Sequence, residues 1–254
     1  MPQILAMLPS TSAVPRSEQT STGLSSTCRD CPTREHCLPA GLDSAELHSF
    51  EHTVARRQHL KRHERLYRRG LPLEHLYIVS SGQIKAERPM PDGRPQVLGF
   101  YLPGQLLGLD ALSSHAYCCD AVALCDSTVC AISYAMLTSL IQQRSTLLLR
   151  FHALFGTELA RQQTNMLLLG NAKAPQRLAA FLMDLACGHQ APAPPAPSFE
   201  LRMSRDDIAS HLGLALESVS RQLTQFRAAG LLEVQNRRIE LLDADALRAI
   251  AISS

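Results

Sequence analysis

The chain has 254 residues, of which 45% are hydrophobic and 19% are charged, and a formal net charge of +2. These values are typical of a globular protein with one or two folded domains. Because the charge is nearly neutral, any nucleic-acid site must be local. There is no run of about 18 uncharged apolar residues and no basic segment before the first apolar residues, so we expect neither a transmembrane helix nor a secretory signal. We therefore expect a cytoplasmic protein.

A cysteine cluster follows an N-terminal stretch that is rich in Ser, Thr and Pro. Residues 1–27 show no periodicity, and we expect them to be disordered. Cys28, Cys31 and Cys37 then follow with the spacing C-x2-C-x5-C. A short loop brings such thiolates together at little entropic cost, so the spacing predicts a metal or redox site. Three ligands do not usually complete such a site, which requires a fourth from elsewhere.

Residues from about 50 to 134 have the pattern of a β domain. Short apolar runs such as Leu76–Val79 and Val97–Phe100 alternate with Gly and Pro. Short strands at this spacing predict an antiparallel sandwich or barrel. With the cysteine segment, they form an expected domain over residues 28–135.

A long helical region is expected over residues 136–172. Apolar residues recur there near heptad spacing, and His152 and Gln162 occupy the intervening positions. A helix of about 25 residues spans nearly 40 Å, more than a small β domain needs, so we expect it to form a dimer interface. The expected interface residues are Leu148, Phe155, Leu159, Gln162, Met166 and Leu169.

Residues 173–254 are expected to form a helix-turn-helix domain with a wing. A helix over 176–187 and a stiff proline-rich connector over 190–197 precede the motif. Ser204 and Asp207 form a capping-box pair, Gly213 supplies the turn, and the second helix runs from about Leu216 to Ala229. Residues 231–242 predict a β-hairpin.

The exposed face of this second helix is suited to the DNA major groove. An Arg can bond guanine and a Glu can accept from cytosine, while wing arginines reach phosphates. Glu217 and Arg221 could instead form a surface ion pair in the free protein. The expected DNA-binding residues are Glu217, Ser218, Ser220, Arg221, Arg237 and Arg238.

These features together resemble the CRP/FNR family of transcription regulators. Leu216–Arg221 looks like the family's recognition-helix signature E-x-x-S-R, and the cysteine cluster followed by Leu38-Pro39 looks like the FNR branch. The resemblance covers about residues 28–250. It implies an α+β protein with an N-terminal antiparallel, jelly-roll-like β-roll sensor domain, a long dimerisation helix and a C-terminal winged helix-turn-helix.

The FNR branch holds an oxygen-labile [4Fe-4S] cluster, and the resemblance assigns its fourth ligand to Cys130. Cys118, Cys119 and Cys125 are competitors from the same region. The resemblance further implies a homodimer on an inverted repeat of TTGAT-like half-sites under anaerobic conditions, activating or repressing genes. Contacts with RNA polymerase are expected through exposed loops such as residues 90–95.

Two positions depart from family patterns. Ala215 stands where the family often has a Thr that caps the recognition helix. Residues 115–119 contain no Arg where the CRP branch uses one to hold a cyclic nucleotide, so we expect no cyclic-nucleotide effector.

Two other uses of the cysteines, and a different class of protein, are alternatives to the iron–sulfur hypothesis. A tetrahedral zinc site would use the same cysteines, with His36 able to replace Cys37. A metal-free thiol switch would pair Cys28 with Cys31. An enzyme is not expected, because the chain has no nucleophile–base pattern, P-loop or dinucleotide fingerprint.

Overall fold

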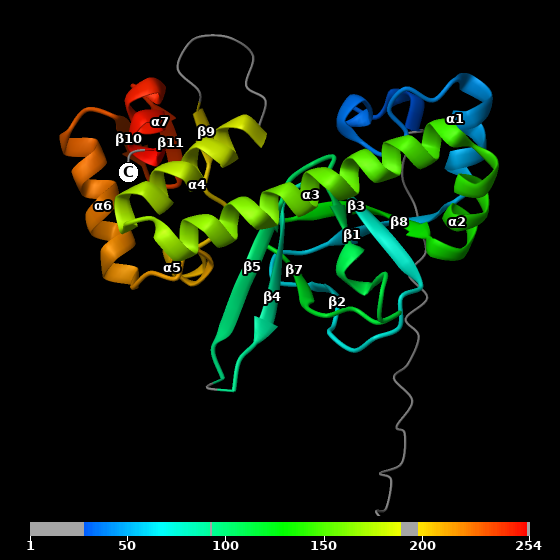
Figure 1. Cartoon of the computed structure of the whole chain (residues 1–254), viewed down its shortest axis with the longest axis horizontal. Helices are drawn as coiled ribbons and strands as arrows, with labels where there is room; N and C mark the ends of the chain where they lie inside the picture. The colour runs from blue at the N-terminus through cyan, green and yellow to red at the C-terminus, as the bar shows by residue number, and fades with distance from the viewer. Residues whose placement is uncertain (1–27, 92, 189–197, 253–254) are drawn as a thin grey trace, which may run out of the picture.

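The computed structural model describes residues 28–91, 93–188 and 198–252. The expected disorder of residues 1–27 and the expected connector over 190–197 fall outside these ranges. A β-roll and a C-terminal helical unit are linked by one long helix that runs across both (Figure 1). Among the described residues, no helix is long and apolar enough to cross a lipid bilayer.

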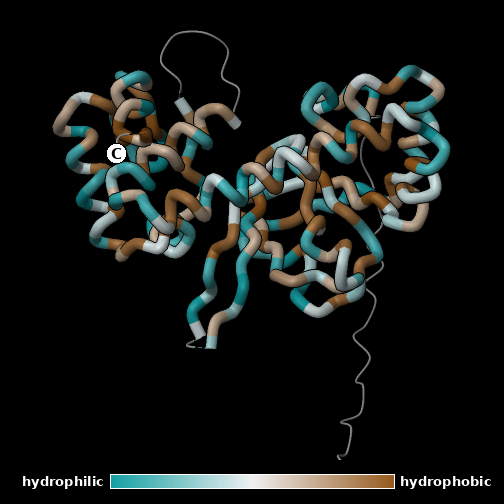
Figure 2. The backbone as a smooth tube through the Cα atoms, in the orientation of Figure 1, coloured by the Kyte–Doolittle hydropathy of each residue, from teal (hydrophilic) through white to brown (hydrophobic). Residues whose placement is uncertain are grey.

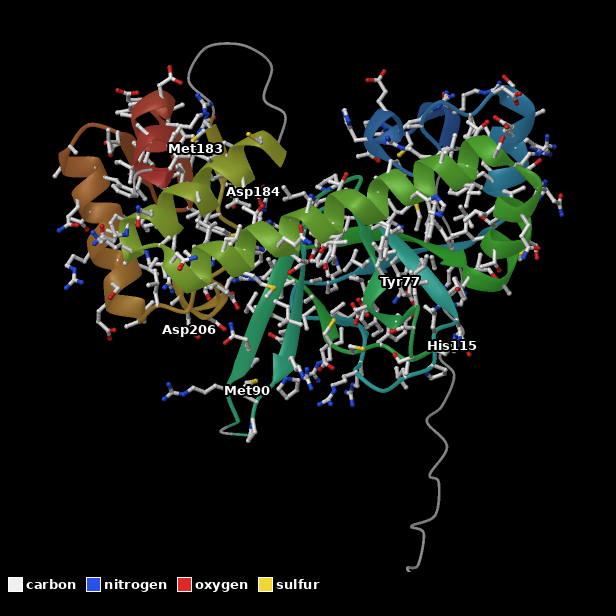
Figure 3. The ribbon with its side chains drawn as sticks, viewed as in Figure 1. Tyr77, Met90, His115, Met183, Asp184 and Asp206 are labelled. Atoms are coloured by element: carbon white, nitrogen blue, oxygen red, sulfur yellow. The ribbon has the colours of Figure 1, made fainter. Side chains whose placement is uncertain are left out.

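Two four-stranded antiparallel sheets form the roll. One has the order β1 (Val54–Leu60), β8 (Ser127–Ser133), β3 (His75–Ser81), β6 (Leu106–Leu107), and the other β2 (Arg65–Tyr67), β7 (Asp120–Ala123), β4 (Ile84–Pro89), β5 (Pro95–Tyr101). Tyr67 stacks on Tyr117 and Tyr77 in the core, with ring centroids 4.0 and 5.6 Å apart. Figure 3 labels Tyr77 within the roll. Aromatic rings therefore fill part of its interior.

The cysteine segment forms short turns that pack on the outside of the roll. It comprises the 3-10 turns η1 (Cys28–Asp30) and η2 (Arg34–His36), followed by α1 (Ser44–Glu51). Asp43 caps α1 in a capping box with Glu46. Leu38 and Phe50, each at most 1% exposed, anchor the segment in an apolar cluster that also contains Cys130.

The helical region after the roll is divided in two, whereas the sequence predicts one continuous stretch. α2 (Tyr134–Gln143) and α3 (Ser145–Asn171) meet at Arg144, whose backbone is extended. The break lets Leu137 and Leu147 enter the same apolar cluster from separate helices. Figure 2 shows apolar and polar residues interspersed along α3, as expected for a helix with one covered face.

The C-terminal unit packs four helices around a small sheet. The helices are α4 (Ala174–Gly188), α5 (Arg205–Leu212), α6 (Leu216–Ala228) and α7 (Ala244–Ile252), and the sheet has the order β10 (Leu232–Gln235), β11 (Arg238–Leu241), β9 (Ser198–Glu200). The predicted helices and wing hairpin are present, and β9 is an additional strand. The expected α+β fold, with its β-roll, long helix and winged helix-turn-helix, is confirmed.

Helix α5 docks against the hairpin of β4 and β5. Lys85 Nζ contacts Asp207 Oδ1 at 2.6 Å and Glu87 Oε2 at 2.8 Å, with all three side chains mostly buried. Ser210 Oγ accepts from the Val97 amide at 2.9 Å and donates to the Pro95 carbonyl at 3.0 Å. These directional contacts hold the helix-turn-helix against the roll.

His211 in this interface should make stability depend on pH. Burial lowers its pKa from 6.5 to about 4, because the ring packs between Phe100 and Phe181. Between pH 6.5 and 4, His211 binds a proton in the unfolded chain but not in the folded chain. The free energy of unfolding therefore decreases as the pH is lowered through this range. We expect this residue to lower the free energy of unfolding by about 2 kcal/mol at pH 5 relative to pH 7, measured by urea unfolding.

The variant His211→Gln should remove this part of the pH dependence. His63→Asn, an exposed loop substitution that tolerates the positive φ of that position, is the matched control. Equal slopes for wild type and His211→Gln between pH 5 and 7 would contradict the assignment.

Candidate cysteine centre and DNA-recognition surface

Four cysteines line one cavity of about 20 Å³ between the cysteine segment and the roll. Cys28, Cys31 and Cys37 come from the segment, and Cys130 comes from the middle of β8, where it pairs with Arg57 of β1 and Ile78 of β3. The rest of the lining is Thr33, Arg34, Pro39, Phe50, Val54, Arg57, Ile78, Ser80 and Ile132. All four cysteines are free thiols in this structure. The fold thus brings together residues up to about a hundred positions apart.

The surroundings favour the protonated thiols when no cation is present. Burial raises the pKa of Cys28 to about 11, and the neighbouring Cys130 adds to the effect. Burial also raises the pKa of Cys37. It raises the pKa of Cys130 as well, and there the nearby Arg57 partly opposes the effect. Several thiolates so close together repel one another, and a bound metal cation would remove this penalty.

The other cysteines lie elsewhere. Cys118 is exposed, Cys119 is buried and bonds through its sulfur to Asp110, and Cys125 lies beside Ser127. None of them lines the four-cysteine cavity, and neither does Cys187 on α4. Sequence position alone left Cys118, Cys119 and Cys125 as competitors, whereas the pairing of β8 with β1 and β3 places Cys130 at the segment.

The possible metal ligands at the four-cysteine cavity are sulfur atoms, and no histidine in the described part of the chain lines it. His36 lines a different cavity, with Gly104 and Arg161. Across residues 28–91, 93–188 and 198–252, no three His, Cys, Asp or Glu side chains are grouped as ligands of a single metal ion. The four thiols that line the cavity are the type of donor that iron–sulfur clusters and zinc take, but among the described residues they are not gathered as ligands around one ion in the metal-free chain.

The helix-turn-helix is built by local signals that the sequence displays. Ser204 Oγ accepts from the Asp207 amide at 3.0 Å, and the Asp207 carboxylate accepts from the Ser204 amide at 2.9 Å. Gly213 ends α5 with a left-handed φ of 60°. The apolar face of α6 is buried, with Val219, Leu223 and Phe226 at most 4% exposed.

The opposite face of α6 is accessible. Glu217 and Arg221 are exposed, and Ser218 and Ser220 are half-buried. The alternative that Glu217 pairs with Arg221 is not seen among the ion pairs of the described residues. Arg205 of α5 donates to Ser220 Oγ at 3.3 Å, which adds a cation that sequence reasoning missed. In the sequence, only its position at the start of the first helix of the motif indicated that Arg205 could lie near the recognition helix.

The wing carries both predicted arginines on its surface. Arg237 is exposed beside Asn236, whose φ of 57° forms the turn between β10 and β11. Arg238 is exposed and donates to Ser198 Oγ at 2.9 Å. The wing can therefore present two cations to a phosphate backbone.

All six predicted interface residues lie on α3. Phe155, Leu159 and Met166 are 42%, 51% and 72% exposed, and Leu169 is 40% exposed. Leu148 is half-buried, and half-buried Gln162 donates to Glu158 Oε1 at 2.7 Å. Exposed apolar side chains gathered along one face of a helix are typical of an association surface.

Comparison with known proteins identifies the family. Residues 57–144 match the cyclic nucleotide-binding domain, and residues 176–250 match the Crp-like helix-turn-helix domain. The chain is 35% identical over 224 residues to the transcriptional activator protein anr of Pseudomonas aeruginosa, covering 88% of this chain and 92% of that protein. The chain belongs to the CRP/FNR family of transcription regulators.

Further similar proteins support the same family assignment. The fumarate and nitrate reduction regulatory protein of Salmonella typhimurium is 34% identical, covering 88% of this chain and 90% of that protein. The structure of FixK2 from Bradyrhizobium japonicum matches with a TM-score of 0.72 and 30% identity, covering 79% of this chain and 99% of that chain. The protein is therefore a DNA-binding transcription regulator and, as the sequence predicts, not an enzyme.

In this CRP/FNR regulator the recognition helix begins without a side-chain cap. Ala215 has the extended backbone of an N-cap but makes no capping hydrogen bond. We expect Ala215→Thr to raise the free energy of unfolding by about 1 kcal/mol, because its hydroxyl can accept from an orphan amide of the first turn. Urea unfolding measures the change. Ala215→Val has a similar shape but no hydroxyl, so an equal gain in both variants would rule out capping.

Proposed function

We propose that this regulator senses oxygen through a [4Fe-4S] cluster held by Cys28, Cys31, Cys37 and Cys130. The observation that carries the proposal is the convergence of these four cysteines on one cavity. Its relatives include a fumarate and nitrate reduction regulatory protein and the anaerobic regulatory protein of Pasteurella multocida, which is 34% identical over 87% of this chain. These names support a function in anaerobic gene control.

The residues around the cavity fit such a group. Four thiols supply its ligands, and Phe50, Val54 and Ile132 limit the access of water. The cavity in the metal-free chain is about 20 Å³, roughly the space of one water molecule, so a larger group would displace the Cys28–Cys37 segment relative to the roll. When bound, the cluster supplies chemistry that oxygen can disrupt, and the chain's own residues convert that loss into movement of the segment.

The output is a change in dimerisation and DNA binding. With the cluster bound, two copies pair through the exposed face of α3 and present their α6 helices to an inverted repeat with TTGAT-like half-sites. Arg221 would bond guanine and Glu217 would accept from cytosine, while Arg237 and Arg238 bind phosphate. Met90, 45% exposed near the tip of the β4–β5 hairpin (Figure 3), belongs to the surface proposed for RNA polymerase. The protein would act in the cytoplasm to activate or repress genes.

Two rival uses of the cysteines are less well supported. A zinc site that replaces Cys37 with His36 is disfavoured, because His36 lines another cavity. A metal-free thiol switch requires a reactive thiolate, whereas burial raises the pKa of Cys28 to about 11. A zinc site with all four cysteines uses the same residues and is distinguished by metal analysis.

Cyclic nucleotide is not proposed as the effector, although the roll matches the cyclic nucleotide-binding domain. Tyr67, Tyr77 and Tyr117 stack within the roll. Asp110, in the turn η3 (Leu109–Ala111), accepts from the Cys118 amide at 2.8 Å, in the region where a phosphate would require a cation. A carboxylate there repels a phosphate.

Metal analysis tests the proposal. Protein isolated without oxygen should contain iron and acid-labile sulfide in equal amounts, little zinc, and an absorption band that air removes. Operator binding should weaken on the same exposure. Protein that holds zinc alone, or binds the operator equally with and without the cluster, would refute oxygen sensing.

A further inference from the structure

Arg150 joins the cysteine segment to α3. Its Nε donates to the carbonyl of Cys37 at 3.2 Å, and its Nη2 donates to the carbonyl of Glu35 at 3.5 Å. Cys37 lines the four-cysteine cavity. One half-buried guanidinium therefore connects the helix with the exposed apolar face to the last cysteine of the segment.

The apolar contacts between the cysteine segment and α3 specify the position of the segment less closely than the hydrogen bonds of Arg150 do. Leu147, Phe151 and Leu154 of α3 pack in the same cluster as Leu38. This apolar packing anchors the segment but is non-directional. Hydrogen bonds from a charged guanidinium are directional and stronger than neutral ones. Arg150 therefore gives the carbonyls of Glu35 and Cys37 a directional link to α3.

The association face begins beside this contact. Leu148 and Phe155 are the immediate sequence neighbours of Leu147 and Leu154, which pack against the cysteine segment. The core face and the association face are thus adjacent on one rigid helix. Arg150 and Leu148 lie on different faces of α3, so a displacement of the Cys37 carbonyl acts on the association face by moving the helix as a whole.

We propose that Arg150 is a positioning residue that transmits the state of the cysteine centre to the dimer interface on α3. The inference rests on the proposed function and names the side chain through which it is regulated. Movement of the Cys28–Cys37 segment shifts the carbonyls bound by Arg150, and the helix follows. Without Arg150, the segment changes state while α3 does not respond.

The test uses full-length Arg150→Met, which keeps the aliphatic stem and removes the donors. Arg144→Met, at the exposed break before α3, is the matched control. Sedimentation gives the dimer dissociation constant of cluster-loaded and metal-free protein, and iron per chain gives the loading. We expect Arg150→Met to load like wild type while the ratio of the two dissociation constants falls by about tenfold. Arg144→Met should keep the wild-type ratio.

A second measurement needs no cluster. In the metal-free chain, amide hydrogen exchange over residues 34–40 should be about fivefold faster in Arg150→Met than in wild type or Arg144→Met. An unchanged dissociation ratio or unchanged exchange overturns the inference. If Arg150→Met loads poorly, Arg150→Lys takes its place. It keeps the positive charge but has a single nitrogen in place of the planar guanidinium, and should show a partial loss. Wild type without iron–sulfur refutes the proposed function, and the exchange data still decide whether Arg150 holds the segment.

Discussion

Substituting Cys130 by Ala should reduce the iron bound by anaerobically isolated protein by roughly tenfold or more. Cys130 is the β-roll cysteine at the four-cysteine cavity, so its loss removes the link between the segment and the roll. Iron and acid-labile sulfide per chain measure the effect directly. Dimerisation and operator binding should fall to the metal-free level.

Cys125→Ala is the matched control for this experiment. Cys125 precedes β8 by two residues and lies beside Ser127, away from the cavity. Its variant should keep the wild-type iron content. Retention of the cluster in Cys130→Ala together with its loss in Cys125→Ala would transfer the fourth ligand to Cys125. Circular dichroism of both variants separates ligand loss from unfolding.

Arg221→Ala should weaken operator binding by about 1–3 kcal/mol for each half-site and relax the preference for guanine. Arg221 is exposed on α6 opposite the buried Val219 and Leu223, so its truncation leaves the packing of the helix intact. Anaerobic titrations with the operator and with a variant altered at the guanine measure both effects. The variant should bind the two sequences almost equally.

Arg237→Ala provides the contrast between reading bases and binding phosphate. Arg237 lies exposed at the tip of the wing. Its loss should weaken binding to all sequences by a similar factor. The slope of the logarithm of the binding constant against the logarithm of the salt concentration should fall in magnitude by about one, because about one fewer counterion is released. If Arg221→Ala behaves in the same way as Arg237→Ala, then Arg221 contacts phosphate and base recognition lies elsewhere on α6.

Local sequence signals determined much of the DNA-recognition unit. The capping pair of Ser204 and Asp207, the left-handed Gly213 and the apolar spacing of α6 act over a few residues, so a linear pattern specifies them. The exposed apolar positions of α3 were visible for the same reason. The break at Arg144 was not predicted, because it depends on how two helices share one apolar cluster of the roll.

For the cysteine centre, too, the sequence predicted one part and the tertiary structure decided the other. The spacing of Cys28, Cys31 and Cys37 marked a metal site within ten residues, since short loops bring ligands together with little entropic cost. The resemblance to the FNR branch assigned the fourth ligand to Cys130, whereas the residues alone left three competitors. The tertiary structure gives a physical reason for that assignment, because the pairing of β8 with β1 and β3 puts Cys130 at the cavity beside the segment. The contacts of Arg150 and Lys85 join residues more than a hundred positions apart. Such contacts depend on the packing of whole elements, which no local pattern specifies.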